Sequence, residues 1–477
     1  MGPHQMRLPK TSLKLCLAVC CLAGYTAAPT FAQTAMPAPP APAASGTTAT
    51  PTPSAPAASG TATAPTPTAP AAPPPGLWIN GIHLYAQIQA GITANPASPD
   101  DGVNFGRLFD DRSNQPQLNQ LMLTATKPLN SSATGFDWGF KLQGIYGSDA
   151  RYTHFLGVFD QNPGPGYINQ FDIFEANVQF HFPFPTAGGM DVKVGMFPTP
   201  LGYEVLDPSS NPFYSHSYIF NFGLPLKHTG ILTTSHLTPL IDLYLGIDTG
   251  VNTTFGSGTG DNNGAPAGIA GFGLNMMGGN LTLLALSHMG PENATRALSP
   301  LGFDANGYMR YLNDVVLTWK VNKKLTLTTE ANWIRDDFAG FFTKGHPSAA
   351  NAFGVAQYFS YGMSDLVTFN ARAEVYRDDN GFFVTAFPAN NVFGYTNFVR
   401  SELGLPSVSV GTGGVPTTYG EITVGLTFKP NLPSPVTGLL IRPELRVDQA
   451  LSGGHPFGTN ANATSQVTIA SDFVLTF

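Results

Sequence analysis

The chain has 477 residues and a net charge of −7, and only 11% of its residues are charged. Soluble domains carry about 25% charged residues, so this composition argues against a series of soluble domains. The mild net charge gives no reason to expect a nucleic-acid partner.

The N-terminus has the layout of an export signal. Basic residues up to Lys14 precede an apolar run over 15–24. A candidate cleavage site with small residues ends at Ala32, so that cleavage would fall before Gln33. The apolar run is too short for a helical span, which needs about 20 residues. We therefore expect residues 1–32 to be a signal peptide.

All three cysteines, at positions 16, 20 and 21, fall within this segment. A mature chain without cysteine has no disulfide and no thiolate metal site. We expect no cofactor and no metal site. A lipoprotein signal ending at Cys20 is an alternative, which the bulky Val19 disfavours.

Residues 33–76 differ sharply from the rest of the chain. They contain no charged and no aromatic residue, and 13 of the 44 residues are proline. The heptamer APAASGT occurs at 41–47 and again at 55–61. Such a segment cannot bury a core. It is expected to be disordered, serving as a periplasmic tether or as a plain spacer.

From residue 77 to 477 the chain alternates apolar and polar residues with the period of β-strands. No run of about 20 apolar residues follows the signal, which excludes helical spans. Runs of about ten alternating residues suit strands that cross a membrane at a tilt. The pattern predicts sixteen strands, with 14 or 18 as alternatives: 80–93, 116–128, 135–148, 170–183, 189–198, 225–237, 239–252, 267–277, 280–289, 308–321, 323–336, 351–363, 365–378, 418–429, 436–450 and 466–477.

The connections between these strands alternate in length. Long links such as 199–224 and 379–417 follow every odd strand, and tight turns such as Gly278-Gly279 and Asn322 follow most even ones. Outer-membrane barrels have short periplasmic turns and longer external loops. The fold class is therefore predicted as all-β, a transmembrane antiparallel barrel with both termini periplasmic. A soluble β-sandwich is the structural rival, but a ring of sixteen strands is too wide for side chains to fill.

The C-terminal strand ends on Phe477, on the apolar parity of its strand. This ending resembles the C-terminal strand of bacterial outer-membrane barrels, which the barrel assembly machinery recognises. Phe477 is therefore expected to close the barrel against 80–93 and to contact that machinery. Within the strands, Pro443 lacks a backbone donor, and we expect a β-bulge at this position.

Charged residues on the inward parity are the candidate pore lining. The functional interpretation is a charged ladder that biases ion passage, and the structural one is a network of ion pairs that braces the wall. Because acids and bases are mixed, the sign of any ion selectivity stays open. The candidates are Arg372, Glu374, Arg442, Glu444, Arg446, Asp448, Glu330 and Asp242.

Link 199–224 is rich in aromatic residues and is a candidate constriction loop, with Tyr203, Glu204, Asp207 and Tyr214 as its candidate residues. A loop of this length either enters the pore, caps it from outside or forms an interface. The chain has no G-x-S-x-G and no H-E-x-x-H motif, so we expect no enzyme activity.

Several stretches resemble the outer-membrane β-barrel porins of the second type, the OmpL-like family. They are Gly147–Tyr152, Gly195–Phe197 with Leu201–Glu204, His228–Gly230, and Arg372–Glu374 leading to Asp378 and Gly381. The resemblance covers nearly all of 78–477 and implies a passive barrel. It supplies no substrate and no binding residues.

The predicted function is an outer-membrane porin for passive diffusion of small hydrophilic solutes or ions. The alternative is a closed or plugged barrel that acts as an envelope anchor or adhesin. A homotrimer is expected only by analogy with sixteen-stranded porins.

Overall fold

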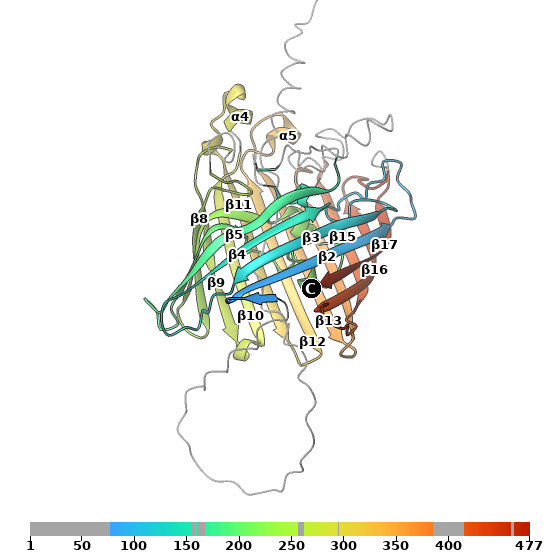
Figure 1. Ribbon diagram of the computed structural model, residues 1–477. Coiled ribbons are helices and arrows are strands. Elements are labelled where there is room, and N and C mark those ends of the chain that lie inside the picture. The colour runs from blue at the N-terminus through green and yellow to red at the C-terminus, as the bar shows by residue number, and fades with distance from the viewer. Residues whose placement is uncertain are drawn as a thin grey trace, which may run out of the picture.

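The computed structural model describes residues 77–477 except 155–157, 160–166, 256–261, 294, 385–414 and 459–461. The predicted signal peptide (1–32) and tether (33–76) therefore lie outside the described residues. Sixteen antiparallel strands, β2 to β17, form one closed barrel because β17 pairs with β2 and β9 pairs with β10. Figure 1 shows the barrel from the side.

The strands correspond one to one with the predicted ranges, which confirms the fold class. Their bounds are β2 Ile82–Ala94, β3 Pro116–Lys127, β4 Asp137–Gly147, β5 Gln170–Phe182, β6 Met190–Pro198, β7 Lys227–His236, β8 Ile241–Asp248, β9 Ala267–Met276, β10 Leu281–Pro291, β11 Met309–Lys320, β12 Leu325–Asp336, β13 Ala350–Gly362, β14 Val367–Asp378, β15 Thr417–Phe428, β16 Gly438–Ser452 and β17 Ser465–Thr476. Short helices are α2 Ala150–Thr153, α3 Tyr218–Phe222, α4 Thr295–Leu298 and α5 Phe341–Lys344, with 3₁₀ turns η1 Pro208–Ser210, η2 Met277–Gly279, η3 Ser299–Leu301 and η4 Ala305–Gly307. No helix in the described part of the chain is long and apolar enough to cross a membrane.

The barrel closes as predicted at Phe477. Its N–H donates to Ala86 O at 2.9 Å, and Ala86 N–H donates back to Phe477 O at 3.4 Å. A short strand that the sequence pattern did not predict, β1 Leu77–Ile79, pairs with the start of β2. The ring of Trp78 stacks on that of His83, with 4.7 Å between ring centroids.

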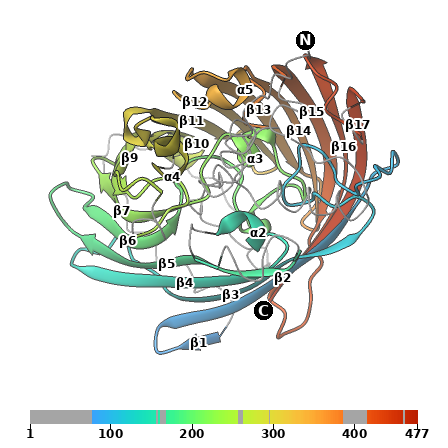
Figure 2. The same cartoon turned by 90° about the horizontal axis from the view of Figure 1, so that it is seen from above.

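The two ends of the barrel differ, and we call them the loop end and the turn end. Tight turns over 237–240, 277–280, 321–324 and 363–366 define the turn end, which also holds Phe477. The long connections, including 95–115, 199–226 and 249–266, start at the loop end. Seen from above, α2 and α3 lie inside the ring of strands (Figure 2).

The outer face of the barrel is apolar and the inner face is polar. On β13 and β14, Phe353, Val355 and Val375 are 45%, 55% and 49% exposed, whereas the inward Glu374 is 3% exposed. Exposed aliphatic and aromatic side chains around a closed wall require a lipid surrounding rather than water.

The prediction of a β-bulge at Pro443 is wrong. The β15–β16 ladder keeps one register from Gly425↔Glu444 to Phe428↔Ile441, and Pro443 itself pairs with Ser471 of β17. The missing donor of proline interrupts local pairing with β15 without requiring an extra residue. The register of this ladder shifts instead between Thr418 and Tyr419.

Candidate functional site

The connection between β6 and β7, residues 199–226, folds into the barrel, and we call it the inserted loop. It carries η1 and α3, whose ends are defined by short polar side chains. Asp207 accepts a hydrogen bond from Ser209 N at the start of η1. Ser217 is the N-cap of α3 and accepts from Phe220 N at 3.0 Å. These caps are the local signals that stop the chain from continuing as strand.

Carboxylates on the barrel wall accept hydrogen bonds from the backbone of the inserted loop. Glu374 accepts from the first N–H groups of α3, those of Tyr218 at 2.6 Å and Ile219 at 2.7 Å. An anion is favourable at a helix N-terminus, where N–H groups lack partners within the helix. Because both hydrogen bonds to Glu374 are buried and short, they hold α3 in one position.

Other wall carboxylates contact the loop in the same way. Glu444 of β16 accepts from Tyr214 N at 2.8 Å, and Glu330 of β12 accepts from Tyr203 N at 3.0 Å. The loop is thereby attached to three strands of the wall, β12, β14 and β16, rather than to one.

Arginines of the wall complete the attachment. Arg372 donates to Glu204 Oε1 at 2.6 Å and to Ser215 O at 2.9 Å, and it also pairs with Glu421. Arg442 pairs with Asp472 and donates to the carbonyls of Pro208 at 2.7 Å and Asn211 at 2.8 Å.

Glu204 is the acidic centre of the loop. Its Oε2 lies 2.6 Å from His216 Nδ1, and its Oε1 lies 2.6 Å from Arg372. Burial alone would raise the pKa of Glu204, but Arg372 and His216 lower it to about 2. The carboxylate therefore stays ionised at neutral pH.

Further segments from the loop end pack against the inserted loop. Arg107, from the connection 95–115, pairs with Asp110 at 2.6 Å and with Asp448 of β16 at 2.7 Å. Arg151 of α2 pairs with Asp111 at 2.7 Å. These contacts join α2 to the connection 95–115, and Arg107 joins that connection to β16 of the wall.

An aromatic cluster fills the space between these segments. Phe109 lies 5.1 Å from Tyr152 and 5.5 Å from Phe220, measured between ring centroids. Tyr218 of α3 stacks on Tyr419 of β15 at 5.1 Å and donates its hydroxyl to Asp448. The loop-end half of the barrel interior therefore contains a packed core, which we call the lumen core.

The predicted pore-lining residues fall into two groups. Arg372, Glu374, Arg442, Glu444, Arg446, Asp448 and Glu330 point inward, are between 0% and 4% exposed, and contact the lumen core. Asp242 also points inward, and its side chain is 17% exposed. That any of the eight lines a permeation path stays a prediction.

The predicted constriction residues all belong to the inserted loop. Glu204 and Tyr214 are 1% exposed, and Tyr203 packs its ring 4.5 Å from that of Tyr358. Asp207 accepts from Gln87 Nε2 of β2 at 3.1 Å. Of the three alternatives for this loop, the structure has it inside the lumen, and its role as a constriction stays a prediction.

The turn-end half of the inner wall is more open. A second set of inward side chains there is partly exposed, with Lys141 25%, Asp191 20%, His236 26% and Asp242 17% exposed. We call these four residues the turn-end wall group. Lys141 pairs with Glu175 at 2.8 Å, and His236 Nδ1 lies 2.7 Å from Asp242.

Several residues that build the interior were not singled out from the sequence. Arg107, Glu421 and Asp472 provide partners for the inward charges, and Asp111 pairs with Arg151. The signal was the row of inward charges on β16, which require buried counter-charges unless water fills the lumen.

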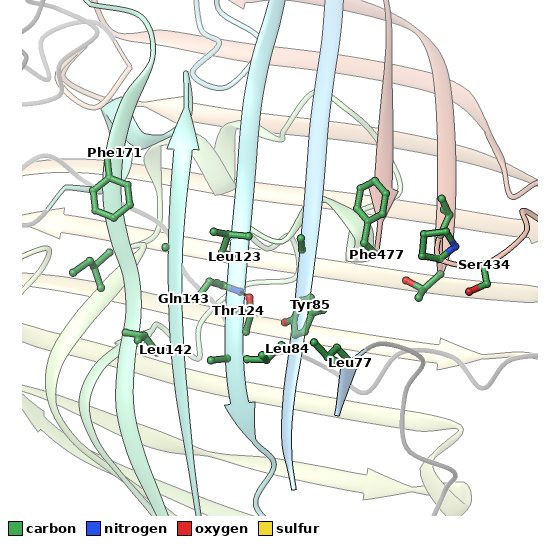
Figure 3. Close-up of a pocket in the computed structure, with 17 residues that line it drawn as sticks. Leu77, Leu84, Tyr85, Leu123, Thr124, Leu142, Gln143, Phe171, Ser434 and Phe477 are labelled. Atoms are coloured by element: carbon green, nitrogen blue, oxygen red, sulfur yellow. Dashed lines mark hydrogen bonds between the residues drawn. The ribbon is translucent and has the colours of Figure 1, made fainter. Parts of the chain in front are cut away.

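A groove of about 1130 Å³ lies on the outer, lipid-facing surface and not in the lumen. Figure 3 shows its apolar side chains on neighbouring strands beside the chain terminus, including Leu77, Leu84, Leu123, Leu142, Phe171 and Phe477. Leu123 and Leu142 are 60% and 51% exposed. The groove belongs to the lipid contact of the barrel.

Comparison with known families agrees with this architecture. A family model described as putative beta-barrel porin-2, OmpL-like, matches residues 81–477. The chain belongs to this family. It is thus an outer-membrane β-barrel of a porin family, a channel protein for small solutes.

Solved structures of similar shape are distant in sequence. They include the outer membrane channel DcaP of Acinetobacter baumannii, with 11% identity, coverage of 84% of this chain and 99% of that chain, and a TM-score of 0.46. Pseudomonas putida OprB has 14% identity, coverage of 83% and 94%, and a TM-score of 0.46. An anion-selective porin from Comamonas acidovorans has 10% identity, coverage of 83% and 99%, and a TM-score of 0.48. No curated protein matches the chain.

Proposed function

We propose that the barrel is a narrow diffusion channel whose width is set by the inserted loop. The observation that carries this proposal is the attachment of the loop by buried wall charges, Glu374 and Arg372 among them, inside a ring of sixteen strands. A barrel of this strand number is otherwise wide enough for an aqueous channel. A loop held in one position across it narrows the passage to small hydrophilic solutes or ions.

The solute path would run along the turn-end wall group before it meets the lumen core. This group carries two carboxylates, Asp191 and Asp242, next to Lys141 and His236. Since charges of both signs face the path, ion preference is expected to be modest and to depend on single residues. Transport needs no catalytic step, and we propose that the protein is not an enzyme.

A plugged barrel that serves as an envelope anchor or adhesin is the second candidate. The observation that favours it is the lumen core, in which seven of the eight predicted pore-lining side chains are at most 4% exposed. In this case the long loops, with the tether at 33–76, would provide the function.

Planar-bilayer recordings of the purified full-length protein separate the two candidates. Stepwise openings in the wild type support the diffusion channel, and silence over many verified insertions would exclude it in favour of the plugged barrel. Insertion is verified by the shift in gel mobility that folded barrels show before heating.

The orientation and partners are part of the same proposal. The turn end with Phe477 would face the periplasm and the loop end the outside, as in barrels with short periplasmic turns. Residues 1–32 would be removed as a signal peptide, and the barrel would associate as a homotrimer. Chemical cross-linking of the protein in its native membrane should give a trimeric product. Detection of monomers alone would contradict the homotrimer.

Assembly would depend on recognition of Phe477 by the barrel assembly machinery. Deletion of Phe477 removes the backbone pair with Ala86 and the aromatic terminus together. The amount of folded protein in the outer membrane is expected to fall strongly. Phe477→Ala, which keeps the backbone pair, is the matched variant, and normal assembly of both variants would contradict a role for the terminus.

A further inference from the structure

Two histidines and two carboxylates meet near the loop end of the barrel, away from the lumen core. His228 of β7, Asp248 of β8 and His288 of β10 each offer a ligand atom, and these atoms lie within 4.8 Å of one another. Glu292, just after β10, lies beside them, with its Oε1 3.9 Å from His288 Nδ1. All four residues are at most 4% exposed.

The hydrogen bonds of this cluster leave several buried polar atoms without partners. These atoms are His228 Nδ1, Asp248 Oδ2, His288 Nδ1 and Glu292 Oε1. Buried polar groups are nearly always paired, since leaving one unpaired costs about 1–3 kcal/mol. His228 Nδ1 and Asp248 Oδ2 face each other at 3.3 Å without a well-aligned hydrogen bond, so the cluster has buried donor atoms that can bind a cation.

One ring nitrogen of His228 already has a hydrogen-bond partner, which leaves the other nitrogen to face the cluster. His228 Nε2 lies 2.7 Å from Thr199 Oγ1, a hydroxyl that can accept its proton. With the proton on Nε2, His228 Nδ1 presents a lone pair toward Asp248 Oδ2, which lies 3.3 Å away. At this distance the two atoms are held together by a cation between them, either a proton on the imidazole or a metal ion.

The same arrangement recurs at His288. Its Nε2 lies 3.1 Å from Asp248 Oδ1, and its Nδ1 faces Glu292 Oε1. A histidine that binds a metal commonly donates its other ring N–H to a carboxylate or hydroxyl. Thr199 is in position to accept from His228 in this way, and Glu292 Oε1 lies 3.9 Å from His288 Nδ1, beyond hydrogen-bond distance.

We propose that His228, Asp248 and His288 form a binding site for a divalent transition-metal ion of the Zn²⁺ type. Imidazole nitrogens with one carboxylate oxygen are typical ligands of zinc. At Zn–ligand distances of about 2.0–2.2 Å, tetrahedral ligands lie about 3.3 Å apart. His228 Nδ1 lies 3.3 Å from Asp248 Oδ2, and His288 Nε2 lies 3.1 Å from Asp248 Oδ1, so both imidazoles face the same carboxylate at separations near that spacing. One ligand atom from each of the three residues lies within 4.8 Å of the others.

The charge balance also fits a divalent cation. Asp248 supplies a negative charge, and Arg310, a positive side chain that acts on His288, is itself paired with Asp336 at 2.8 Å. Phe197 packs 5.9 Å from His228 and shields one side of the site from water. An enclosed site of this kind would stabilise the barrel by joining β7, β8 and β10, rather than carry out catalysis.

Close approach of the strands depends on a glycine. Gly230 lies opposite Asp248 in the β7–β8 ladder, and a Cβ atom there would come within 2.6 Å of Asp248 Cα. Glycine at 230 therefore lets β8 come close to β7 at the level of the site. The proposal replaces the expectation from the sequence that the chain has no metal site, which followed the absence of cysteine from the mature chain.

The test measures how much Zn²⁺ the folded full-length protein binds after the metal has been removed and then added again. Chelator-treated protein in detergent is dialysed against Zn²⁺, and bound metal is counted by elemental analysis. We expect one Zn²⁺ per wild-type chain, and less than about one tenth of that in Asp248→Asn and in His288→Gln. An absence of Zn²⁺ from the wild type, or full binding by both variants, would overturn the proposal.

His236→Gln is the matched control. His236 also sits between carboxylates, but its two ring nitrogens have separate partners, Asp242 at 2.7 Å and Asp191 at 3.4 Å. This variant should keep one Zn²⁺ per chain, and loss of Zn²⁺ from it would place the bound metal elsewhere and count against the site.

Two measurements keep the test decisive if Asp248→Asn or His288→Gln fails to fold. Thr199→Val removes only the acceptor for His228 Nε2, and it should weaken Zn²⁺ binding about 10–100-fold. In the wild type, Co²⁺ should give the intense visible absorption of a tetrahedral site, displaced by one equivalent of Zn²⁺. An unchanged affinity in Thr199→Val together with an octahedral Co²⁺ spectrum would refute the proposal.

Discussion

The two halves of the barrel interior differ in how far their inward charged side chains are buried and paired. In the half of the interior that the lumen core fills, Arg372, Arg442 and Arg446 are at most 1% exposed, and each has a carboxylate and a loop carbonyl as partners. In the turn-end half, Lys141 and His236 stay about a quarter exposed. Inward charged side chains therefore hold the loops where the loops pack over them, and they remain accessible to solvent where no loop covers them.

The comparison teaches that inward parity alone does not make a residue part of a pore. Buried ion pairs are costly to break because a lone buried charge remains, whereas exposed pairs contribute little. The packed half should respond to substitution through stability, and the open half through ion passage. The following substitutions test that division, beginning with the largest expected effect.

Arg372→Leu should strongly destabilise the barrel. The change leaves Glu204 and Glu421 buried without their shared cation, at a cost of about 3–5 kcal/mol. The midpoint of unfolding by urea in lipid vesicles measures the loss. Arg377→Leu on the same strand is the control, because its pair with Asp379 is about a third exposed or more and should contribute less than about 1 kcal/mol. Equal losses in both variants would remove the distinction between the halves.

The attachment of the inserted loop should weaken in acid through Glu204. The pKa of Glu204 is about 2 in the folded protein and about 4.5 when unperturbed. A lowered pKa contributes stability that is present above pH 4.5 and is lost as the pH falls toward 2. The difference in unfolding midpoint between wild type and Glu204→Gln should therefore be constant near pH 7 and shrink below about pH 4.5. A difference that does not change down to pH 2 would show that Glu204 is not held by Arg372 and His216.

Asp242→Asn should change ion preference with little effect on folding. Its side chain is partly exposed on the open half, so removing its charge should shift the reversal potential in a salt gradient by a few millivolts toward anions. Arg442→Gln, in the packed half, should leave the reversal potential unchanged in channels that assemble. A larger shift from Arg442→Gln than from Asp242→Asn would move the ion path into the packed half.

The barrel itself was predictable because its signals are local. Alternation and turn residues identified all sixteen strands, with end positions that differ by a few residues, as for 239–252 against Ile241–Asp248. The loop asymmetry and the pairing of the last strand with the first followed from the same pattern. The expected bulge at Pro443 was wrong because a lost hydrogen bond is tolerated without a change of register.

The interior could not be predicted to the same depth because its contacts are long-range. Arg107 meets Asp448 across 341 positions of the chain, and Glu374 meets Tyr218 across 156. No periodicity marks such partners. The sequence did indicate which wall residues carry charge and which loop is rich in aromatic side chains, and it left open whether that loop enters the lumen.

The central claim is that the inserted loop narrows an otherwise open barrel. Its most direct test is single-channel conductance of the wild type against a variant in which residues 203–222 are replaced by a short Gly-Ser linker. Without the loop and α3, conductance is expected to rise several-fold, while the strands still assemble. Equal conductance of the two proteins, with the variant folded and inserted, would contradict the claim.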